Sequence, residues 1–346
     1  MFCTIRPRNG RLRGAAALGT LALAIVLVGC GQTGASEHLS ADGSFANPPP
    51  LEYPGIRVTE DVQYGVAGSE PLLLDVCRQR QDTPSTAGPR RAVLVVHGGS
   101  WRAGDKASPH WRSVCEWLAS EGFVAFSINY RLAPLFVFPA QIEDVRAAVR
   151  WIRQPDQATR FDIDPDRIGA FGGSAGGNLV ALLGLEGEGE WSLGSRVSAV
   201  VDLSGPTDLT AEGAERTGVD SAFQAITAQY LGCESLATCA VAEQASPLYY
   251  ADETDPPFFI ANSTNELIPL AQSEDLVKRL RANDVEVTFV TVDGSLHSIA
   301  LLDSAMRTRI ASFLRAKLGA AAEVAPAPTP AGPPAPHAAR IHSPVE

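Results

Sequence analysis

One serine stands in a glycine-rich turn of a kind that exposes a hydroxyl group. Ser174 is the centre of Gly172-Gly173-Ser174-Ala175-Gly176, which has the pattern Gly-x-Ser-x-Gly and lies between apolar runs at 168–171 and 179–185. Glycines permit the sharp turn that lifts the hydroxyl from the backbone, and a helix N-terminus favours developing negative charge. The pattern predicts a nucleophile. A phosphate-binding loop is the alternative, but the lysine and the longer glycine spacing of such loops are missing.

A nucleophilic serine needs a base, which is usually histidine. Of six histidines, His297 lies in Gly294-Ser295-Leu296-His297-Ser298, directly after the last predicted strand at 285–292. The others are His38 near the N-terminus, His97 in a separate motif, His110 at the start of a helix, and His337 and His342 near the C-terminus. Elimination and position favour His297 as the base. The alternative is a lone solvent-exposed loop histidine.

A second glycine motif follows the predicted strand at 92–96. His97-Gly98-Gly99-Ser100-Trp101 matches the His-Gly-Gly loop whose backbone N–H groups form the oxyanion hole of many esterases. Gly98 and Gly99 allow the backbone to approach a substrate oxygen. By itself the motif could be a simple turn at a strand end, but together with the serine turn downstream it becomes specific.

Strands and helices that alternate along the chain must position these residues. We expect strands at 62–64, 72–76, 92–96, 123–128, 168–171, 197–203, 258–261 and 285–292, and helices around 111–118, 142–152, 179–185, 270–280 and 299–314. The first two strands predict a hairpin, and the rest predict a mostly parallel sheet with helices on both faces. In such sheets the chemistry lies at the carboxyl ends of the strands, where Ser174, His297 and the Gly98 motif fall.

At this point the sequence resembles the α/β-hydrolase superfamily, specifically the hormone-sensitive-lipase-like and bacterial feruloyl-esterase-like carboxylesterases, over residues 61–318. The matching segments include Asn129-Tyr130-Arg131-Leu132-Ala133-Pro134, Phe138-Pro139-Ala140-Gln141-Ile142-Glu143-Asp144-Val145, Ile163-Asp164-Pro165-Asp166-Arg167-Ile168, Ser174-Ala175-Gly176-Gly177-Asn178, Ser246-Pro247-Leu248 and Pro256-Pro257-Phe258. The resemblance implies an α/β-hydrolase fold, with Ser174 as nucleophile, His297 as base, and the N–H groups of Gly98, Gly99 and Ala175 as oxyanion hole. It implies no metal or organic cofactor. We interpret the Asn-Tyr-Arg and Gln-x-x-Asp segments as scaffold.

The catalytic acid departs from the family pattern. In these enzymes the acid stands four residues before the proline of a Val/Ile-Pro pair, and counting back from Pro269 of Ile268-Pro269 reaches Asn265 in place of aspartate. Glu266 is one residue later and one methylene longer, and we predict that it reaches His297. Asp293 is a less favoured substitute. The alternative is that Asn265 occupies the acid position and that the enzyme is slow or inactive.

Charge and composition limit the classes of protein. Lys and Arg number 28 and Asp and Glu number 39, so the net charge is 28 − 39 = −11, and 45% of residues are hydrophobic. This excludes a mostly disordered chain and argues against nucleic acid as a partner. The segment 207–245, where related enzymes carry a lid, is small, polar and moderately helical. It shows no large apolar face, so we expect no interfacial lipase behaviour.

The N-terminal segment has the features of an export signal. Arginines precede an apolar run at 15–28 that ends in Leu27-Val28-Gly29-Cys30, which resembles the lipobox of bacterial lipoproteins. We predict a signal peptide at 1–29, lipidation of Cys30, a tether at 30–52, the enzyme domain at 53–318 and a disordered Ala/Pro-rich tail at 319–346. A signal cleaved elsewhere, or a short anchor helix, is the alternative.

Export favours disulfide bonds among the four remaining cysteines. Cys233 and Cys239 enclose a short polar segment and are the easiest pair to close, which leaves Cys77–Cys115 by elimination. Four buried free thiols are the alternative. No cysteine pattern suggests a metal site.

These observations predict an exported, membrane-anchored lipoprotein of the cell envelope that cleaves small or carbohydrate-linked carboxylic esters through an acyl-enzyme. An amide or peptide hydrolase on the same fold and a non-catalytic binding lipoprotein remain as alternatives. The oligomeric state and the acyl and alcohol specificity are not readable from the sequence.

Overall fold

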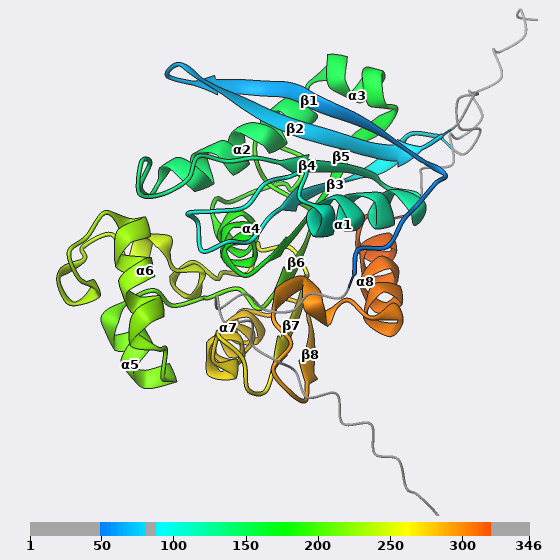
Figure 1. Ribbon diagram of the computed structural model, residues 1–346. Coiled ribbons are helices and arrows are strands. Elements are labelled where there is room, and N and C mark those ends of the chain that lie inside the picture. Colours follow the sequence, from blue (N-terminus) through cyan, green and yellow to red (C-terminus); the bar gives the residue numbers. More distant parts are fainter. Residues whose placement is uncertain (1–48, 81–87, 320–346) are drawn as a thin grey trace, which may run out of the picture. The chain divides into compact units, whose positions relative to one another are not determined.

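The computed structural model describes residues 49–80 and 88–319 (Figure 1). The predicted signal peptide, Cys30, most of the tether and nearly all of the C-terminal tail lie outside these residues. Among the described residues, no helix is both long enough and apolar enough to cross a membrane.

Eight strands form one sheet in the order β1-β2-β4-β3-β5-β6-β7-β8. The strands are β1 (Ile56–Ala67), β2 (Glu70–Gln79), β3 (Arg90–Val96), β4 (Val124–Ile128), β5 (Ile163–Gly173), β6 (Ala199–Leu203), β7 (Phe258–Ser263) and β8 (Val287–Val292). The hairpin β1–β2 joins β4 in antiparallel fashion, and every pairing from β4 to β8 is parallel. The predicted opening hairpin and mostly parallel sheet are confirmed.

Helices cover both faces of this sheet, as predicted (Figure 1). They are α1 (Pro109–Ser120), α2 (Ala140–Ile152), α3 (Pro155–Phe161), α4 (Ala175–Leu185), α5 (Ala211–Thr217), α6 (Ser221–Leu231), α7 (Leu270–Ala282) and α8 (Ser304–Lys317). Strand β3 shows how the two layers arise, because successive side chains point to opposite faces. Leu94 and Val96 pack in the layer of α2, α4, α6 and α7, whereas Val93 and Val95 pack in the layer of α1 and α8. Strands buried on both faces explain the continuous apolar runs in the sequence.

The final predicted helix, 299–314, is two elements in the structure. A short 3-10 helix spans Ser298–Leu301, and α8 begins only at Ser304. Asp303 separates them because its side chain accepts a hydrogen bond from the Met306 N–H and so caps a new helix. The break keeps His297 and Ser298 in a tight turn at the sheet edge.

The lid segment contains α5 and α6, which Figure 1 shows beside the main body of the sheet. The prediction that this segment lacks a large apolar face is wrong for α6. Phe223, Tyr230 and Leu231 fall on one side of the helix and are all buried in the core. Ala222 and Ala225 lie on the exposed side of α6, so the contrast between its two sides is weak in the sequence.

Both predicted disulfide bonds are present. Cys77 of β2 joins Cys115 of α1 with 5.8 Å between the Cα atoms, and Cys233 joins Cys239 just after α6 with 5.5 Å. The first bridge fastens the antiparallel edge of the sheet to a covering helix. The second closes the loop that follows the lid helix.

Candidate active site

Ser174 stands at the turn from β5 into α4, in a backbone conformation with φ 56° and ψ −126°. Its N–H donates a hydrogen bond to the Leu203 carbonyl oxygen at 2.8 Å, which fixes the turn to β6. The flanking glycines are required by contact: a Cβ on Gly172 would lie 2.2 Å from the Gly176 carbonyl oxygen, and one on Gly176 would lie 2.1 Å from the Val96 carbonyl oxygen. A positive φ at a non-glycine residue costs about 1–3 kcal/mol, so the surrounding structure must hold Ser174 in this conformation.

His297 follows β8 and is brought to the same end of the sheet. The next residue, Ser298, donates its N–H to the Ser204 hydroxyl at 3.0 Å. The Ser298 side chain also lies so close to the serine turn that a Cβ on Gly173 would be 2.2 Å from its oxygen. His297 is thus adjacent in sequence to a residue that packs against the residue before Ser174. Its side chain is only 7% exposed.

The carboxylate that meets His297 is Glu266. Nδ1 of His297 and Oε2 of Glu266 form a hydrogen bond, and the Glu266 side chain has no exposed surface. Its other oxygen accepts the Ser263 N–H at 3.4 Å, at the end of β7. A buried carboxylate on Nδ1 sets the tautomer and leaves Nε2 for the nucleophile.

Asn265, at the position that the family pattern assigns to the acid, does not form the hydrogen bond to Nδ1 of His297. Asn265 is exposed, its backbone N–H donates to the Gly294 carbonyl oxygen at 2.9 Å, and its side chain makes no hydrogen bond within residues 49–80 and 88–319. Asp293 is also exposed. The turn after β7 therefore presents its second residue past the strand to solvent and its third to the histidine.

The glycine loop after β3 lies directly against the serine turn. A Cβ on Gly98 would be 2.8 Å from the Gly173 carbonyl oxygen and 3.1 Å from Cβ of Ser174. Gly99 has φ 120°, which L-residues rarely adopt. Ala175 begins α4, so its N–H is one of the free donors of a helix N-terminus. None of these three N–H groups donates a hydrogen bond to another group in the described part of the chain.

His97 orients one of these donors. Its Nδ1 is 2.8 Å from the Gly98 carbonyl oxygen, which shares a peptide plane with the Gly99 N–H. Its ring stacks on Tyr130 at 4.4 Å, and the Tyr130 hydroxyl donates to the His97 carbonyl oxygen at 2.9 Å. Burial lowers the pKa of His97 to about 4, so the ring is neutral at pH 7 and donates from Nδ1. A buried neutral ring that is bonded to the backbone is suited to orientation and not to the role of base.

Asp202, at the carboxyl end of β6, was not singled out in the sequence. It is fully buried, and its Oδ1 accepts the Gly205 N–H at 2.9 Å. Burial raises the pKa of Asp202 to about 7, and the negative charge of Glu266 adds to this effect. The signal that could have found Asp202 is its position inside the apolar run 197–203, where a side chain is expected to be buried with the strand.

The segments interpreted as scaffold have that role. Arg131 forms a forked pair with Asp144, with nitrogen to oxygen distances of 2.7–3.0 Å. Asn129 accepts the Lys106 N–H at 2.7 Å and so ties the segment after β4 to the loop that follows the glycine motif. Gln141 donates to the Phe136 carbonyl oxygen at 2.7 Å.

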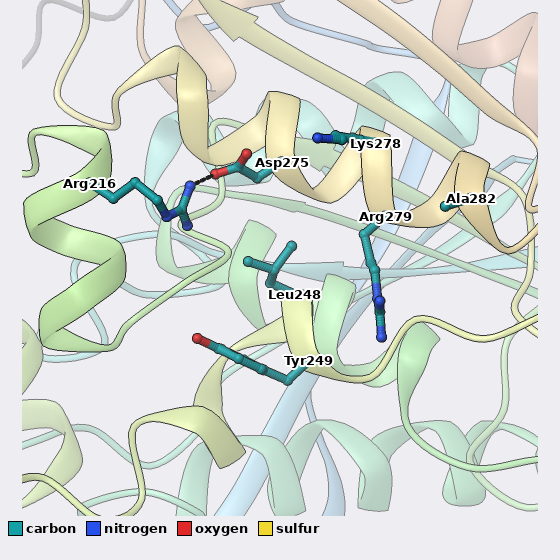
Figure 2. A pocket seen from close by; sticks show the side chains of 7 residues that line it. All are labelled: Arg216, Leu248, Tyr249, Asp275, Lys278, Arg279 and Ala282. Carbon is teal, nitrogen blue, oxygen red and sulfur yellow. Dashed lines mark hydrogen bonds and ion pairs between the residues drawn. The ribbon is translucent and has the colours of Figure 1, made fainter.

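One cavity on the domain lies apart from Ser174, His297, Glu266 and the glycine loop. It has a volume of about 450 Å³ and lies between α5, the segment before β7 and α7 (Figure 2). It is lined by Arg216, Leu248, Tyr249, Asp275, Lys278, Arg279 and Ala282, and includes the ion pair between Arg216 and Asp275. None of the predicted site residues lines it. In the described residues, no cluster of three or more His, Cys, Asp or Glu side chains is arranged to hold a metal ion.

Comparison with known proteins identifies the family. The pattern that defines the family called BD-FAE matches residues 81–280, more than half of the chain. The chain belongs to the BD-FAE family. The match confirms the resemblance seen in the sequence and agrees with the α/β-hydrolase fold described above.

Related proteins and structures share this architecture. Esterase LipC of Mycobacterium tuberculosis is 32% identical over 250 residues, which cover 69% of this chain and 60% of LipC. Esterase LipQ of the same organism is 28% identical over 300 residues, covering 83% of this chain and 69% of LipQ. A truncated carbohydrate esterase from gut microbiota has a TM-score of 0.64 at 24% identity, over 78% of this chain and 99% of its own. An esterase of Thermogutta terrifontis, Est2, has a TM-score of 0.60 at 24% identity, over 80% of this chain and 96% of Est2. These last two likenesses establish a shared fold.

Proposed function

We propose that this protein is a serine carboxylesterase that hydrolyses its substrate through an acyl-enzyme. The observation that carries the proposal is the buried Glu266–His297 pair, set beside the turn that holds Ser174 at a positive φ. Membership of the BD-FAE family and the relatives named as esterases support it.

In this mechanism the Ser174 hydroxyl attacks the ester carbonyl carbon while His297 takes its proton. Glu266 accepts the hydrogen bond from Nδ1 and stabilises the imidazolium that forms. The N–H groups of Gly98, Gly99 and Ala175 bind the oxygen that becomes negative. His297 then gives its proton to the leaving alcohol, and water repeats the sequence to release the acid.

For the substrate, we propose small or carbohydrate-linked esters. The similar structure described as a carbohydrate esterase supports this class, and the lid segment is short. An amide or peptide hydrolase uses the same groups and is the second candidate. A non-catalytic binding protein was favoured only by Asn265 in the acid position, and the contact between Glu266 and His297 argues against it.

A substrate panel on the isolated domain tests the proposal. We expect turnover of p-nitrophenyl acetate and butyrate and slow turnover of the octanoate, with p-nitroanilide analogues hydrolysed far more slowly. Ser174→Ala should remove all ester hydrolysis while the circular dichroism spectrum stays unchanged. Retained hydrolysis in Ser174→Ala, or a preference for anilides, would contradict the assignment.

We further propose that the domain is exported and held to a membrane through lipid on Cys30. Two disulfide bonds in the domain support an oxidising compartment. In the expressing bacterium, full-length protein should enter the detergent phase of a Triton X-114 partition, and Cys30→Ser should shift it to the aqueous phase. Cys3→Ser is the matched control and should leave the partition unchanged. Equal partition of the Cys30→Ser variant and the natural protein would count against lipidation.

A further inference from the structure

Trp101 follows the oxyanion glycines in an unfavourable backbone conformation. Ser100 and Trp101 have φ 54° and 56°, in the left-handed region that bulky residues avoid. The Trp101 side chain is nevertheless completely buried. Two consecutive residues in this region persist only where the surrounding structure holds them. Contacts of the Trp101 side chain therefore hold a segment that begins close to Gly98 and Gly99, which are three and two residues earlier.

The indole of Trp101 is tied to the helix that carries the nucleophile. Its Nε1–H donates to Oδ1 of Asn178 at 3.2 Å. Asn178 lies one turn along α4 from Ser174, and its own N–H donates to the Ser174 carbonyl oxygen at 3.0 Å. The Asn178 amide nitrogen donates to the carbonyl oxygens of Pro206 and Ala245 at 3.0 and 3.1 Å, so its orientation is fixed. The glycine loop and the serine turn are thus joined through a buried hydrogen bond between side chains.

From the other side, the lid helix α6 packs on the same indole. The ring of Tyr230 stacks on Trp101 with centroids 4.2 Å apart and planes 5° from parallel. Phe223, two turns earlier on α6, lies at 6.1 Å. The N–H of Phe138 donates to the Tyr230 carbonyl oxygen at 3.0 Å, which anchors this end of the helix. The indole is therefore held between the nucleophile helix and the lid.

The hydroxyl of Tyr230 takes no part in this arrangement. Tyr230 is fully buried, and its hydroxyl has no hydrogen-bond partner among the described residues. Only the ring of Tyr230 therefore interacts with Trp101 at this position. Phenylalanine would preserve the stack, whereas leucine would remove it.

We propose that Trp101 is a positioning residue that sets the Gly98 and Gly99 N–H groups relative to Ser174, and that the lid helix holds it in place through the ring of Tyr230. The inference rests on the proposed function, because it assigns the lid a part in forming the oxyanion hole. Loosening the indole displaces N–H groups that act only on the developing oxyanion, so it lowers kcat and leaves KM largely unchanged. A tryptophan that merely fills the core would change the amount of folded protein and not the rate per active site.

The test compares four full-length variants with the natural protein. Trp101→Phe keeps a ring but removes the N–H donor, and Tyr230→Leu removes the stacked ring. Tyr230→Phe is the conservative partner of the second change. Trp151→Phe is the matched control, because Trp151 is partly buried and packs against Phe126 and Phe161. Active sites are counted with a fluorophosphonate, and kcat and KM are measured with p-nitrophenyl acetate. The inhibition constant of phenylboronic acid, which forms a tetrahedral adduct with an activated serine, reports the oxyanion hole directly.

We expect Trp101→Phe and Tyr230→Leu to lower kcat per active site by about tenfold to a hundredfold, with KM within about threefold. The inhibition constant of phenylboronic acid should rise by a similar factor in both. Tyr230→Phe should restore both quantities to within about twofold of the natural protein, and Trp151→Phe should not change them. If Trp101→Phe is not recovered folded, the pair Tyr230→Leu and Tyr230→Phe carries the test alone.

Two results would overturn the inference. One is that Tyr230→Leu, or folded Trp101→Phe, has the same kcat and the same boronate inhibition constant as the natural protein. The other is an equal loss in Tyr230→Phe and Tyr230→Leu, because the ring would then not be the cause. Failure of the proposed function has a different signature: the natural protein would not react with the fluorophosphonate, or Ser174→Ala would hydrolyse as well as the natural protein does.

Discussion

Replacing Glu266 by glutamine removes one negative charge beside His297 and preserves the shape of the side chain. The carboxylate has no exposed surface and the imidazole is only 7% exposed, so bulk water screens their interaction little. Two unit charges about 4 Å apart interact by about 4 kcal/mol at the effective dielectric constant of about 20 that suits protein sites. At about 1.4 kcal/mol for each factor of ten, loss of the charge lowers kcat by about three orders of magnitude.

The assay is the hydrolysis of p-nitrophenyl acetate at pH 8 by folded Glu266→Gln. Asn265→Ala is the matched control, because Asn265 is next in sequence, is exposed, and binds the fold only through its backbone N–H. We expect kcat of Asn265→Ala and of Asn265→Asp within about twofold of the natural value, because neither side chain is directed to His297. More than a tenth of natural activity in Glu266→Gln would refute the electrostatic reasoning. So would a large gain in Asn265→Asp combined with a neutral Glu266→Gln.

Three further changes test other parts of the site and domain. Gly98→Ala places a methyl group 2.8 Å from a backbone oxygen of the serine turn and should lower kcat at least about a hundredfold. Gly55→Ala, whose methyl group meets nothing within 4 Å, should leave kcat unchanged. Equal rates in these two variants would contradict the role of the glycine loop. Replacing Cys77 and Cys115 by alanine opens a loop with a sequence separation of 38. Urea denaturation should show that the free energy of unfolding falls by about 4 kcal/mol. A fall below about 1 kcal/mol would be inconsistent with the chain-entropy argument. Burial raises the pKa of Asp202 to about 7, above its ordinary value of 3.8, so between pH 4 and 7 the unfolded chain releases this proton while the folded protein keeps it, and the folded protein loses stability as the pH rises. Asp202→Asn should therefore gain stability relative to the natural protein from pH 4.5 to pH 8, and a difference independent of pH would argue against a buried, protonated carboxyl.

The positions of Ser174 and His297 could be predicted because each follows a strand of the parallel part of the sheet. Once the strands are recognised, topology brings their carboxyl ends together, and few residue types at those ends can act as nucleophile and base. The same reasoning found the Gly98 loop. These predictions needed the order of elements and not the details of packing.

The remaining features depend on contacts that the sequence does not encode locally. Glu266 and Asn265 are neighbours of similar polarity, and only the direction of the turn after β7 buries one and exposes the other. The stack of the lid helix on Trp101 becomes visible only in three dimensions, because the residues of α6 do not indicate which side chain they pack on. Asp303 divides the last predicted helix because a cap there outweighs the apolar periodicity around it.

The most direct test of the account is the mass of the domain after reaction with a fluorophosphonate. The account predicts one adduct per molecule, mapped by peptide sequencing to Ser174, formed slowly in Glu266→Gln and not at all in Ser174→Ala. Absence of an adduct in the natural protein, or an adduct on another serine that Ser174→Ala leaves intact, would contradict it.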